Sequence, residues 1–229
     1  MNKSMTTIEK VQTLQDAFPF WNKLTVEQLD MIQKKAVFSS IEKGNPLISG
    51  FCECAGMLAV LSGSLRVYML SEDGKEITLF RIGAGELCVL SASCVLSSLN
   101  FHVNIDAAAD SEIIQLPSDL FAKLVQNNIY VEAFTYRKVS ERFSDVMWAL
   151  QQILFKSFDQ RLASFLINES REINSTRIKI THEEIAKYTG SAREVVTRML
   201  HYFAEENLVR LGRGSIEIID LKGLEKIIS

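Results

Sequence analysis

The sequence lacks the features that mark membrane-spanning, secreted and disulfide-rich proteins. No apolar run approaches the roughly 20 residues that a membrane helix needs, and the amino-terminal stretch MNKSMTTIEKVQTLQDAF has no signal-peptide apolar core. Four cysteines in 229 residues are too few for a dense disulfide scaffold. We therefore expect a folded cytoplasmic protein with reduced thiols and no membrane partner.

A strong net charge is also missing, since the formal value is only −3. This argues against nonspecific binding of nucleic acid through a basic bulk. From Leu150 onward 12 lysines and arginines stand against 11 acidic residues, a balance of +1, whereas the preceding part has 13 against 17, a balance of −4. Any DNA contact must therefore come from local placement of charge. The hydrophobic content of 47% is enough to bury a core in each of two domains.

Apolar residues follow two different spacing patterns in the first half of the chain. Residues 8–35 show helical spacing, with a helix N-cap at Thr25. Over residues 37–116 the apolar runs are short and separated by turns, and Asp73-Gly74 lies between two strand-like runs as a hairpin signal. Regular turns at this spacing predict an antiparallel sandwich or barrel.

A long helical region is predicted to begin at Pro117-Ser118-Asp119, a combination that suits a helix start. Its apolar residues recur at alternating spacings of three and four, the a/d pattern of a helical seam. The seam residues are Tyr136, Val139, Phe143, Val146, Leu150 and Ile153. Such a seam packs either against its own domain or against the same helix of a second copy, and its length favours a parallel coiled-coil homodimer.

The carboxy-terminal part predicts a winged helix-turn-helix. Two helices are expected over residues 182–188 and 192–205, and LVRLGRGSIEIID follows them as two strands around a glycine-containing turn. The helices are joined at Thr189-Gly190, where glycine can take a positive φ angle.

Both helix starts carry the S/T-x-x-E pattern of a capping box. Thr181 with Glu184, and Ser191 with Glu194, would satisfy backbone donors in the first turn of each helix. The two patterns therefore separate the region into two short helices rather than one long one.

The second of these helices has an apolar and a polar side. Its buried stripe is expected to consist of Val196, Met199, Leu200 and Phe203, and its outward side carries Arg193, Glu194, Thr197, Arg198 and His201. Arginine presents paired donors that match the two major-groove acceptors of guanine, and glutamate accepts from the amino group of cytosine. The alternative is an exposed ion pair between Glu194 and Arg198. The capped helix pair, the strand hairpin and the upstream seam together favour a helix that reads DNA.

Three segments carry a resemblance to a known family. They are ITHEEIAKYTGSAREVVTRMLHYFAEENLV, the segment LSGSLRVYMLSEDGKEITLFRIGAGE and the long helix between them. In this order they resemble the Crp/Fnr family of bacterial transcription regulators over nearly the whole chain. The resemblance implies an α+β fold in three parts: an effector-sensing β-roll domain of the cyclic-nucleotide-binding type with N-terminal helices over 1–118, a dimerisation helix and hinge over 119–157, and a winged helix-turn-helix DNA-binding domain over 158–229.

The resemblance also implies how the chain engages DNA. It implies a homodimer whose recognition helices enter successive major grooves of a double-stranded site with two-fold symmetry, with RNA polymerase as a further partner. Arg193, Glu194 and Arg198 match the R-E-x-x-x-R triad of the branch that prefers TGTGA-like half-sites, and Thr197 is a further base-reading candidate. The phosphate-contacting candidates are Thr181, His182, Ser191, Gly212 and Arg213, because helix starts and wing tips lie near the DNA backbone.

The sensor half departs from the family pattern. The G-E-L triplet at 85–87 is similar to the ribose-binding motif, but the family's register places V-L-S at 89–91 in the site, with Leu90 in place of the glutamate. The phosphate-binding arginine should follow shortly after, yet no arginine occurs between Arg81 and Arg137. A buried phosphate without a cationic partner carries a heavy desolvation penalty, which argues against cyclic AMP as the effector.

The region equivalent to the pocket offers other chemistry. Its candidates are Cys88, Leu90, Cys94 and His102, and Cys52 with Cys54 forms an earlier C-x-C pair. Thiolate and imidazole suit haem, soft metals or redox chemistry, whereas cysteine often serves only as a small buried apolar residue. The family branch with an iron-sulfur cluster places its cysteines in an amino-terminal run, and none precedes Cys52. An apolar or aromatic effector also fits, so the sequence assigns neither an effector nor a metal.

Three hypotheses about function follow. The leading one is a dimeric DNA-binding regulator in which an effector shifts a hinge over residues 155–159 and reorients the recognition helices. The second is a constitutive DNA-binding regulator whose β-roll has lost its ligand. The third is an enzyme that uses Cys88 or Cys94 as nucleophile with His102; no acid at a defined spacing would orient that pair, so no catalytic residues are predicted.

Overall fold

The computed structural model describes four stretches of the chain. They are residues 6–48, 55–72, 74–89 and 103–228. The chain folds as an α+β protein with two compact units. The first unit comprises Met1–Met69 and Leu79–Asp145, and the second comprises Leu70–Thr78 and Val146–Ser229. No helix in the four stretches is both long and apolar enough to span a bilayer.

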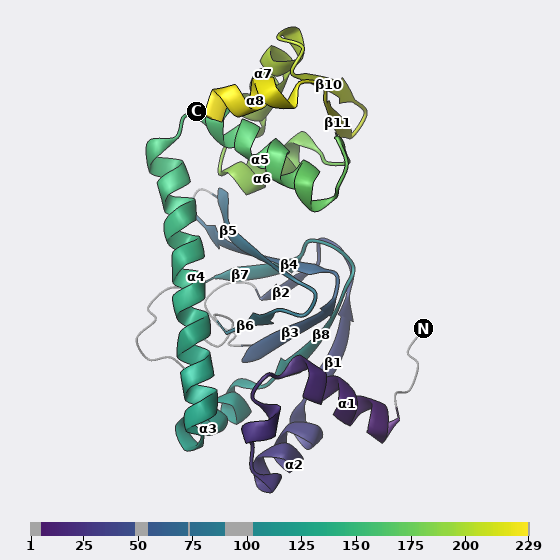
Figure 1. The fold of residues 1–229 in the computed structure, drawn as a ribbon, viewed down its shortest axis with the longest axis vertical. Helices are drawn as coiled ribbons and strands as arrows, with labels where there is room; N and C mark the ends of the chain where they lie inside the picture. Colours follow the sequence, from purple (N-terminus) through teal and green to yellow (C-terminus); the bar gives the residue numbers. More distant parts are fainter. Residues whose placement is uncertain (1–5, 49–54, 73, 90–102, 229) are drawn as a thin grey trace. The chain divides into compact units, whose positions relative to one another are not determined.

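The described strands of the β-roll form two antiparallel sheets (Figure 1). One sheet has the strand order β1-β8-β3-β6, and the other has the order β2-β7-β4-β5. The strands are β1 (Val37–Ile41), β2 (Pro46–Ile48), β3 (Met57–Ser62), β4 (Ser64–Leu70), β5 (Glu76–Gly83), β6 (Leu87–Cys88), β7 (Asn104–Ala107) and β8 (Ser111–Leu116). This architecture confirms the β-roll that the short apolar runs predict.

The turn between β4 and β5 has the expected hairpin character. The backbone N–H of Ser71 donates to the carbonyl of Lys75 at 2.9 Å, and Gly74 has a φ angle of 78°. Only glycine adopts such a φ angle without steric cost. Asp73, the other half of the predicted turn signal, lies outside the described residues.

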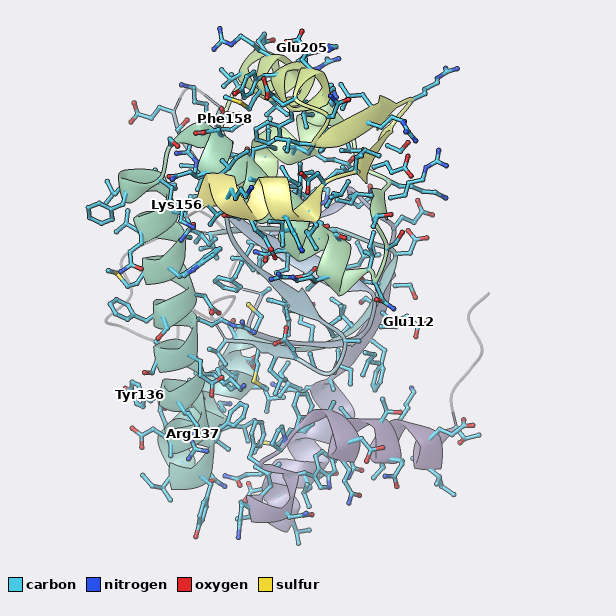
Figure 2. All side chains as sticks on the ribbon, turned by 45° about the horizontal axis from the view of Figure 1, so that its top comes forward. Glu112, Tyr136, Arg137, Lys156, Phe158 and Glu205 are labelled. Atoms are coloured by element: carbon cyan, nitrogen blue, oxygen red, sulfur yellow. The ribbon has the colours of Figure 1, made fainter. Side chains whose placement is uncertain are left out.

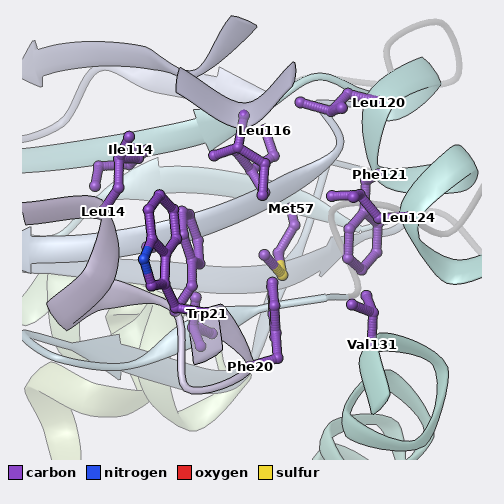
Figure 3. Close-up of a cluster of buried hydrophobic side chains, with 14 of the residues drawn as sticks. Leu14, Phe20, Trp21, Met57, Ile114, Leu116, Leu120, Phe121, Leu124 and Val131 are labelled. Carbon is purple, nitrogen blue, oxygen red and sulfur yellow. The ribbon is translucent and has the colours of Figure 1, made fainter. Parts of the chain in front are cut away.

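A cluster of buried side chains joins the β-roll to the helices of the first unit (Figure 3). Phe20, Trp21, Met57, Leu116 and Phe121 belong to it, and none is more than 7% exposed. Burial of each such side chain contributes about 1.5–3 kcal/mol. The cluster therefore holds the helices against the sheet that contains β3 and β8.

Capping boxes begin the amino-terminal helices. In α1 (Thr7–Ala17) the cap is Thr6, and in α2 (Val26–Lys35) it is Thr25, whose hydroxyl oxygen accepts from the backbone N–H of Gln28 at 3.2 Å. A short 3-10 helix, η1 (Trp21–Lys23), connects the two. The N-cap predicted at Thr25 is confirmed.

The predicted long helical region is two helices, α3 (Ser118–Asn127) and α4 (Ile129–Phe155). Asn128 lies between them, and its side chain bonds to α4 and to the amino-terminal helical region. Its Oδ1 accepts from the backbone N–H of Tyr130 at 3.0 Å, and its Nδ2 donates to the carbonyl of Lys23 at 2.9 Å. The polar side chain therefore begins α4 and ties it to the amino-terminal helices.

The second unit is a winged helix-turn-helix preceded by one helix and followed by another. Its elements after α4 are α5 (Phe158–Glu172), β9 (Arg177–Ile178), α6 (His182–Thr189), α7 (Arg193–Glu205), β10 (Val209–Gly212), β11 (Ser215–Ile218) and α8 (Leu221–Ile228). The strands form an antiparallel sheet in the order β10-β11-β9. Leu162, Leu166, Ile185, Leu200 and Phe203 are fully buried in its core.

One predicted cap is confirmed and the other is wrong. Thr181 and Glu184 form the expected capping box at the start of α6. Ser191 does not cap α7, because its N–H still donates to the carbonyl of Ala186 and it remains in the turn. The N-cap of α7 is Ala192, which makes no side-chain cap.

Candidate nucleic-acid interface and sensor site

The turn between α6 and α7 holds the second helix on a fixed core. Gly190 has a φ angle of 63°, and its N–H donates to the carbonyl of Ala186, closing α6 as predicted. On the inner side of α7, Val196, Leu200 and Phe203 are completely buried. Substituting any of these three would disturb the packing that orients the opposite side of the helix.

The outer side of α7 presents three exposed charged residues in its first two turns. They are Arg193, Glu194 and Arg198. The alternative ion pair between Glu194 and Arg198 does not form, because no salt bridge joins them among the described residues. Two guanidinium groups and one carboxylate are therefore available to a partner molecule.

Thr197 differs from the other base-reading candidates. Its hydroxyl donates to the carbonyl of Arg193 at 2.9 Å, and its oxygen lies 2.9 Å from Nδ1 of His182. A hydroxyl committed to these bonds has little capacity left for a base edge. Thr197 thus contacts His182, the first residue of α6, and its base-reading role stays a prediction.

The remaining phosphate-contacting candidates lie at helix starts and at the wing. Thr181 and Ser191 precede α6 and α7, and Gly212 and Arg213 stand at the turn between β10 and β11. Arg213 is exposed. Gly214 has a φ angle of 65°, which favours glycine in the wing turn. The wing therefore carries an exposed cation at its turn.

Several large apolar side chains of α4 are exposed. Tyr136 is 55% exposed, Phe143 64%, Leu150 43% and Ile153 38%, and Tyr136 is labelled on α4 in Figure 2. Met147, Trp148, Leu154 and Phe155 are exposed on the same helix. Exposure of so many large apolar side chains on one helix is typical of an interaction surface.

Two predicted seam residues behave differently. Val139 is partly buried and packs against the core of the first unit, and Val146 is also partly buried. The a/d spacing therefore overestimates the width of the exposed stripe. The other four predicted seam residues are exposed. Together with two exposed neighbours on the same helix we name them the α4 stripe: Tyr136, Phe143, Met147, Leu150, Ile153 and Leu154.

Of the predicted effector-pocket residues, only Cys88 lies in the described part of the chain. It belongs to β6 and is 1% exposed. Leu90, Cys94 and His102 lie outside the described residues, as do Cys52 and Cys54. No group of three or more metal-ligating side chains occurs within the described stretches.

The G-E-L triplet at 85–87 forms the turn between β5 and β6. Glu86 accepts the backbone N–H of Gly83 through Oε2 at 2.8 Å, and its Oε1 lies 3.4 Å from Nη2 of Arg142. Arg142 comes from α4, and its Nη1 donates to Asp145 at 2.9 Å. The carboxylate of this triplet is therefore engaged with its own turn and with α4.

Arg142 is a partly buried cation, with a side chain that is 12% exposed, that the sequence reasoning missed. Burial lowers its pKa, but Asp145 and Glu86 raise the pKa by more, so the guanidinium stays charged. A search of the segment between Arg81 and Arg137 cannot find it, because it is contributed by a helix later in the chain. A second buried arginine, Arg66, forms a close ion pair with Asp106 at 2.6 Å inside the β-roll.

Comparison with known proteins agrees with this arrangement. The model of the Crp-like helix-turn-helix domain matches residues 160–227, and the model of the cyclic nucleotide-binding domain matches residues 38–128. The first match covers the helix pair and wing, and the second covers the β-roll.

Individual relatives match most of the chain. A crystal structure of a chain from Eubacterium rectale, described as a transcriptional regulator of the crp/fnr family, is 42% identical, with a TM-score of 0.89, and the match covers 93% of this chain and 99% of that chain. The Cyclic AMP receptor protein of Thermus thermophilus is 26% identical over 91% of this chain and 96% of its own length. Transcriptional activator protein Anr of Pseudomonas protegens is 26% identical over 86% of this chain and 83% of its own length.

Proposed function

Because the chain belongs to the Crp/Fnr family of transcription regulators, we propose that it binds a two-fold symmetric DNA site as a homodimer. Its relatives are transcription regulators rather than enzymes, in agreement with the prediction from sequence. The observation that carries the proposal is the exposed set of Arg193, Glu194 and Arg198 on a helix whose other side is buried.

Base reading is assigned to these three residues. Each arginine can donate two hydrogen bonds to guanine, and Glu194 can accept one from cytosine. A rigid helix places such groups in the major groove without further ordering of the chain. Thr197 has a supporting role in this proposal, because its hydroxyl is held by His182 and the Arg193 carbonyl.

Phosphate contacts position the helix without reading sequence. We assign them to Thr181, His182, Ser191, Gly212 and Arg213. The first three lie at or before the starts of α6 and α7, where unpaired backbone N–H groups favour anions. The last two lie at the wing turn.

The homodimer is assigned to the α4 stripe. An identical helix in parallel orientation would bury the exposed aromatic and aliphatic side chains of both copies. In this proposal residues 1–118 sense the effector, residues 119–157 form the dimerisation helix and hinge, and residues 158–229 bind DNA. α4 ends at Phe155 and α5 begins at Phe158, so the hinge has a physical break (Figure 2). RNA polymerase is the further proposed partner.

The effector is proposed to be a small molecule other than cyclic AMP. The absence of arginine between Arg81 and Arg137 supports this, although one relative bears the name of a cyclic AMP receptor. Haem is a second candidate, which an absorption spectrum of protein purified without oxygen would detect. A constitutive regulator without an effector predicts DNA binding that no added ligand changes.

The proposal is tested by selecting binding sites from a random double-stranded DNA library with purified protein. We expect enrichment of inverted repeats whose half-sites lie about one helical turn apart. The Arg198→Ala variant should relax one base position in each half-site, whereas Arg171→Ala, at an exposed arginine of α5, should select the same sites. Selection of no symmetric sequence by the wild-type protein would contradict the proposal.

A further inference from the structure

The second unit contains a cavity that the proposed DNA interface does not use. Its volume is about 300 Å³, at the lower end of the range for small-molecule sites. Its walls come from the end of α4, the link between α4 and α5, α5 itself and α8, and all the lining residues belong to the second unit. The lining includes Trp148, Lys156, Ser164, Ile167, Arg171 and Glu225. The cavity therefore has room for one small molecule, outside the β-roll.

One wall of the cavity is an exposed indole that the proposed dimer contact leaves uncovered. Trp148 is 53% exposed and belongs to α4. At about 100° per residue it lies about 140° around the helix from Phe143 and about 160° from Leu150, two members of the α4 stripe. A helix pair formed through that stripe therefore does not bury Trp148. An aromatic ring stacked on the indole would remove this apolar surface from water.

The cavity also has an aliphatic part. Ile167 is 3% exposed and belongs to the core of the second unit, and Ile228, also in the lining, is partly buried against that core. Apolar walls with a few polar groups are typical of sites for small organic molecules. The indole and the two isoleucines together favour a ligand with an apolar ring.

The charged side chains of the lining leave one positive charge in excess. They are two cations and one carboxylate. Nη2 of Arg171 lies 3.1 Å from Oε1 of Glu225, so this pair is already formed and joins α5 to α8. Lys156, by contrast, forms no ion pair within the described stretches, and its Nζ lies 3.5 Å from the Ser164 hydroxyl oxygen, beyond the usual hydrogen-bond length. The ammonium group of Lys156 is therefore available to an anion.

We infer that this cavity binds a small aromatic carboxylate, with its ring against Trp148 and Ile167 and its carboxylate on Lys156. A single negative charge matches the excess positive charge, whereas a phosphate monoester, with about −1.5 to −2 at pH 7, would bring unmatched charge close to Glu225. The inference goes beyond the proposed function, because the cavity lies outside the residues 1–118 to which the effector is assigned. Lys156 follows the last residue of α4 and precedes α5, so the ligand contacts the proposed hinge (Figure 2).

The test measures binding of benzoate and phenylacetate to the purified full-length protein by titration calorimetry at constant ionic strength. Three further probes separate the parts of the recognition: benzyl alcohol lacks the charge, acetate lacks the ring, and phenyl phosphate carries a second charge. We expect a Kd of about 1 mM or below for at least one aromatic carboxylate, and at least about tenfold weaker binding of each of the three other probes. Equal or tighter binding of phenyl phosphate would overturn the assignment to a carboxylate.

Substitutions place the binding in this cavity. Lys156→Gln should weaken it about tenfold to hundredfold, and Lys156→Arg, which keeps the charge, should retain most of the affinity. Trp148→Ala should weaken it about tenfold, and Trp148→Phe should largely restore it because an aromatic face is kept. Lys226→Gln is the matched control, at an exposed lysine of α8 outside the lining, and should bind like the wild type.

The variants also report whether they are folded. Trp148 is exposed and Lys156 is partly exposed, so each variant without a probe should melt close to the wild-type temperature. If the wild-type protein binds neither aromatic carboxylate at millimolar concentration, or if Lys156→Gln or Trp148→Ala binds as tightly as the wild type, the inference is overturned. Selection of a symmetric DNA site without any probe tests the proposed function separately, so each can fail alone.

Discussion

Nδ1 of His182 lies 2.9 Å from the hydroxyl oxygen of Thr197, and this bond joins the first residue of α6 to the middle of α7. The Thr197 hydroxyl already donates to the carbonyl of Arg193. While the hydroxyl donates to that carbonyl, its oxygen accepts from Nδ1–H of His182; in the other tautomer the hydroxyl donates to Nδ1 instead. In the charged imidazole both nitrogens carry a proton, so Nε2 is a donor.

Protonation of His182 should lower the stability of the free protein. Burial lowers the pKa of His182, and the nearby His201 and Arg193 lower it further. The unfolded chain, with a histidine pKa of about 6.5, therefore binds more protons than the folded one just below that pH. The free energy of unfolding should be constant above this range and fall as the pH drops through the lowered pKa of His182. Chemical denaturation between pH 5 and 8 measures this fall in unfolding free energy. Its slope with pH should correspond to the uptake of at most about one proton per chain.

DNA affinity should show the opposite dependence on pH. A phosphate beside Nε2 favours the charged imidazole, so binding takes up a proton and strengthens as the pH falls, by at most about tenfold per pH unit. Fluorescence anisotropy at constant salt measures this with the selected site. His182→Gln should abolish the pH-dependent gain, whereas His201→Gln should retain it. An identical pH profile in wild type and His182→Gln would remove His182 from the phosphate contacts.

Removal of the side-chain hydroxyl should destabilise the protein at Thr181, before α6, and should have little effect at Ser191, before α7. Thr181→Ala removes a capping box and should cost about 0.5–2 kcal/mol of unfolding free energy. Ser191→Ala should change the stability little, because no side-chain bond of Ser191 caps α7. Urea denaturation of both variants provides the comparison, and equal losses would show that Ser191 caps α7 in solution.

These caps illustrate where prediction from sequence succeeds and where it ends. The S/T-x-x-E pattern is local, so it finds α6 correctly, but it cannot register that the turn after Gly190 keeps Ser191 bonded to Ala186. The pattern therefore places the start of α7 one residue early.

The helices around the site show a second limit. The seam spacing correctly predicts a long helix, but it cannot tell that Val139 packs inward, since packing depends on the neighbouring strands. α8 was not predicted, although Leu221, Leu224 and Ile228 have helical spacing. Arg142 was missed because its contact Glu86 lies far away in the sequence, and such a contact has no spacing signal. The exposed side of α7 was found because one helix carries all its residues.

Arg198 should be the residue whose loss most clearly alters sequence selectivity. It is exposed and makes no ion pair with Glu194 in the described part of the chain. Arg198→Ala should weaken binding to the selected site by about 1–3 kcal/mol, and should accept several bases where wild type requires one. Arg213→Ala, at the wing, should instead weaken binding to all DNA sequences alike. It should also reduce the salt dependence of the DNA affinity by the amount expected for about one phosphate contact. A uniform loss for Arg198→Ala would reassign it to the DNA backbone.

Phe143 should be the most sensitive position of the dimer contact. It is 64% exposed at the centre of the α4 stripe, so a substitution there leaves the core of the first unit intact. Phe143→Asp would place two carboxylates against each other in a parallel helix pair, and burial of an unpaired charge is strongly unfavourable. We expect a monomer by light scattering at low micromolar concentration, with dimer affinity reduced about a hundredfold or more.

The matched control for this variant is Glu141→Lys, a charge change two residues away. Residues two apart on a helix point in nearly opposite directions, so Glu141 lies on the side away from the α4 stripe. This variant should remain a dimer, and loss of the exposed ion pair between Glu141 and Lys138 should lower the melting temperature only slightly. Because a paired helix also sets the spacing of the two α7 helices, Phe143→Asp should retain weak binding to a half-site and lose the preference for inverted repeats. A dimeric Phe143→Asp protein would place the contact on another surface.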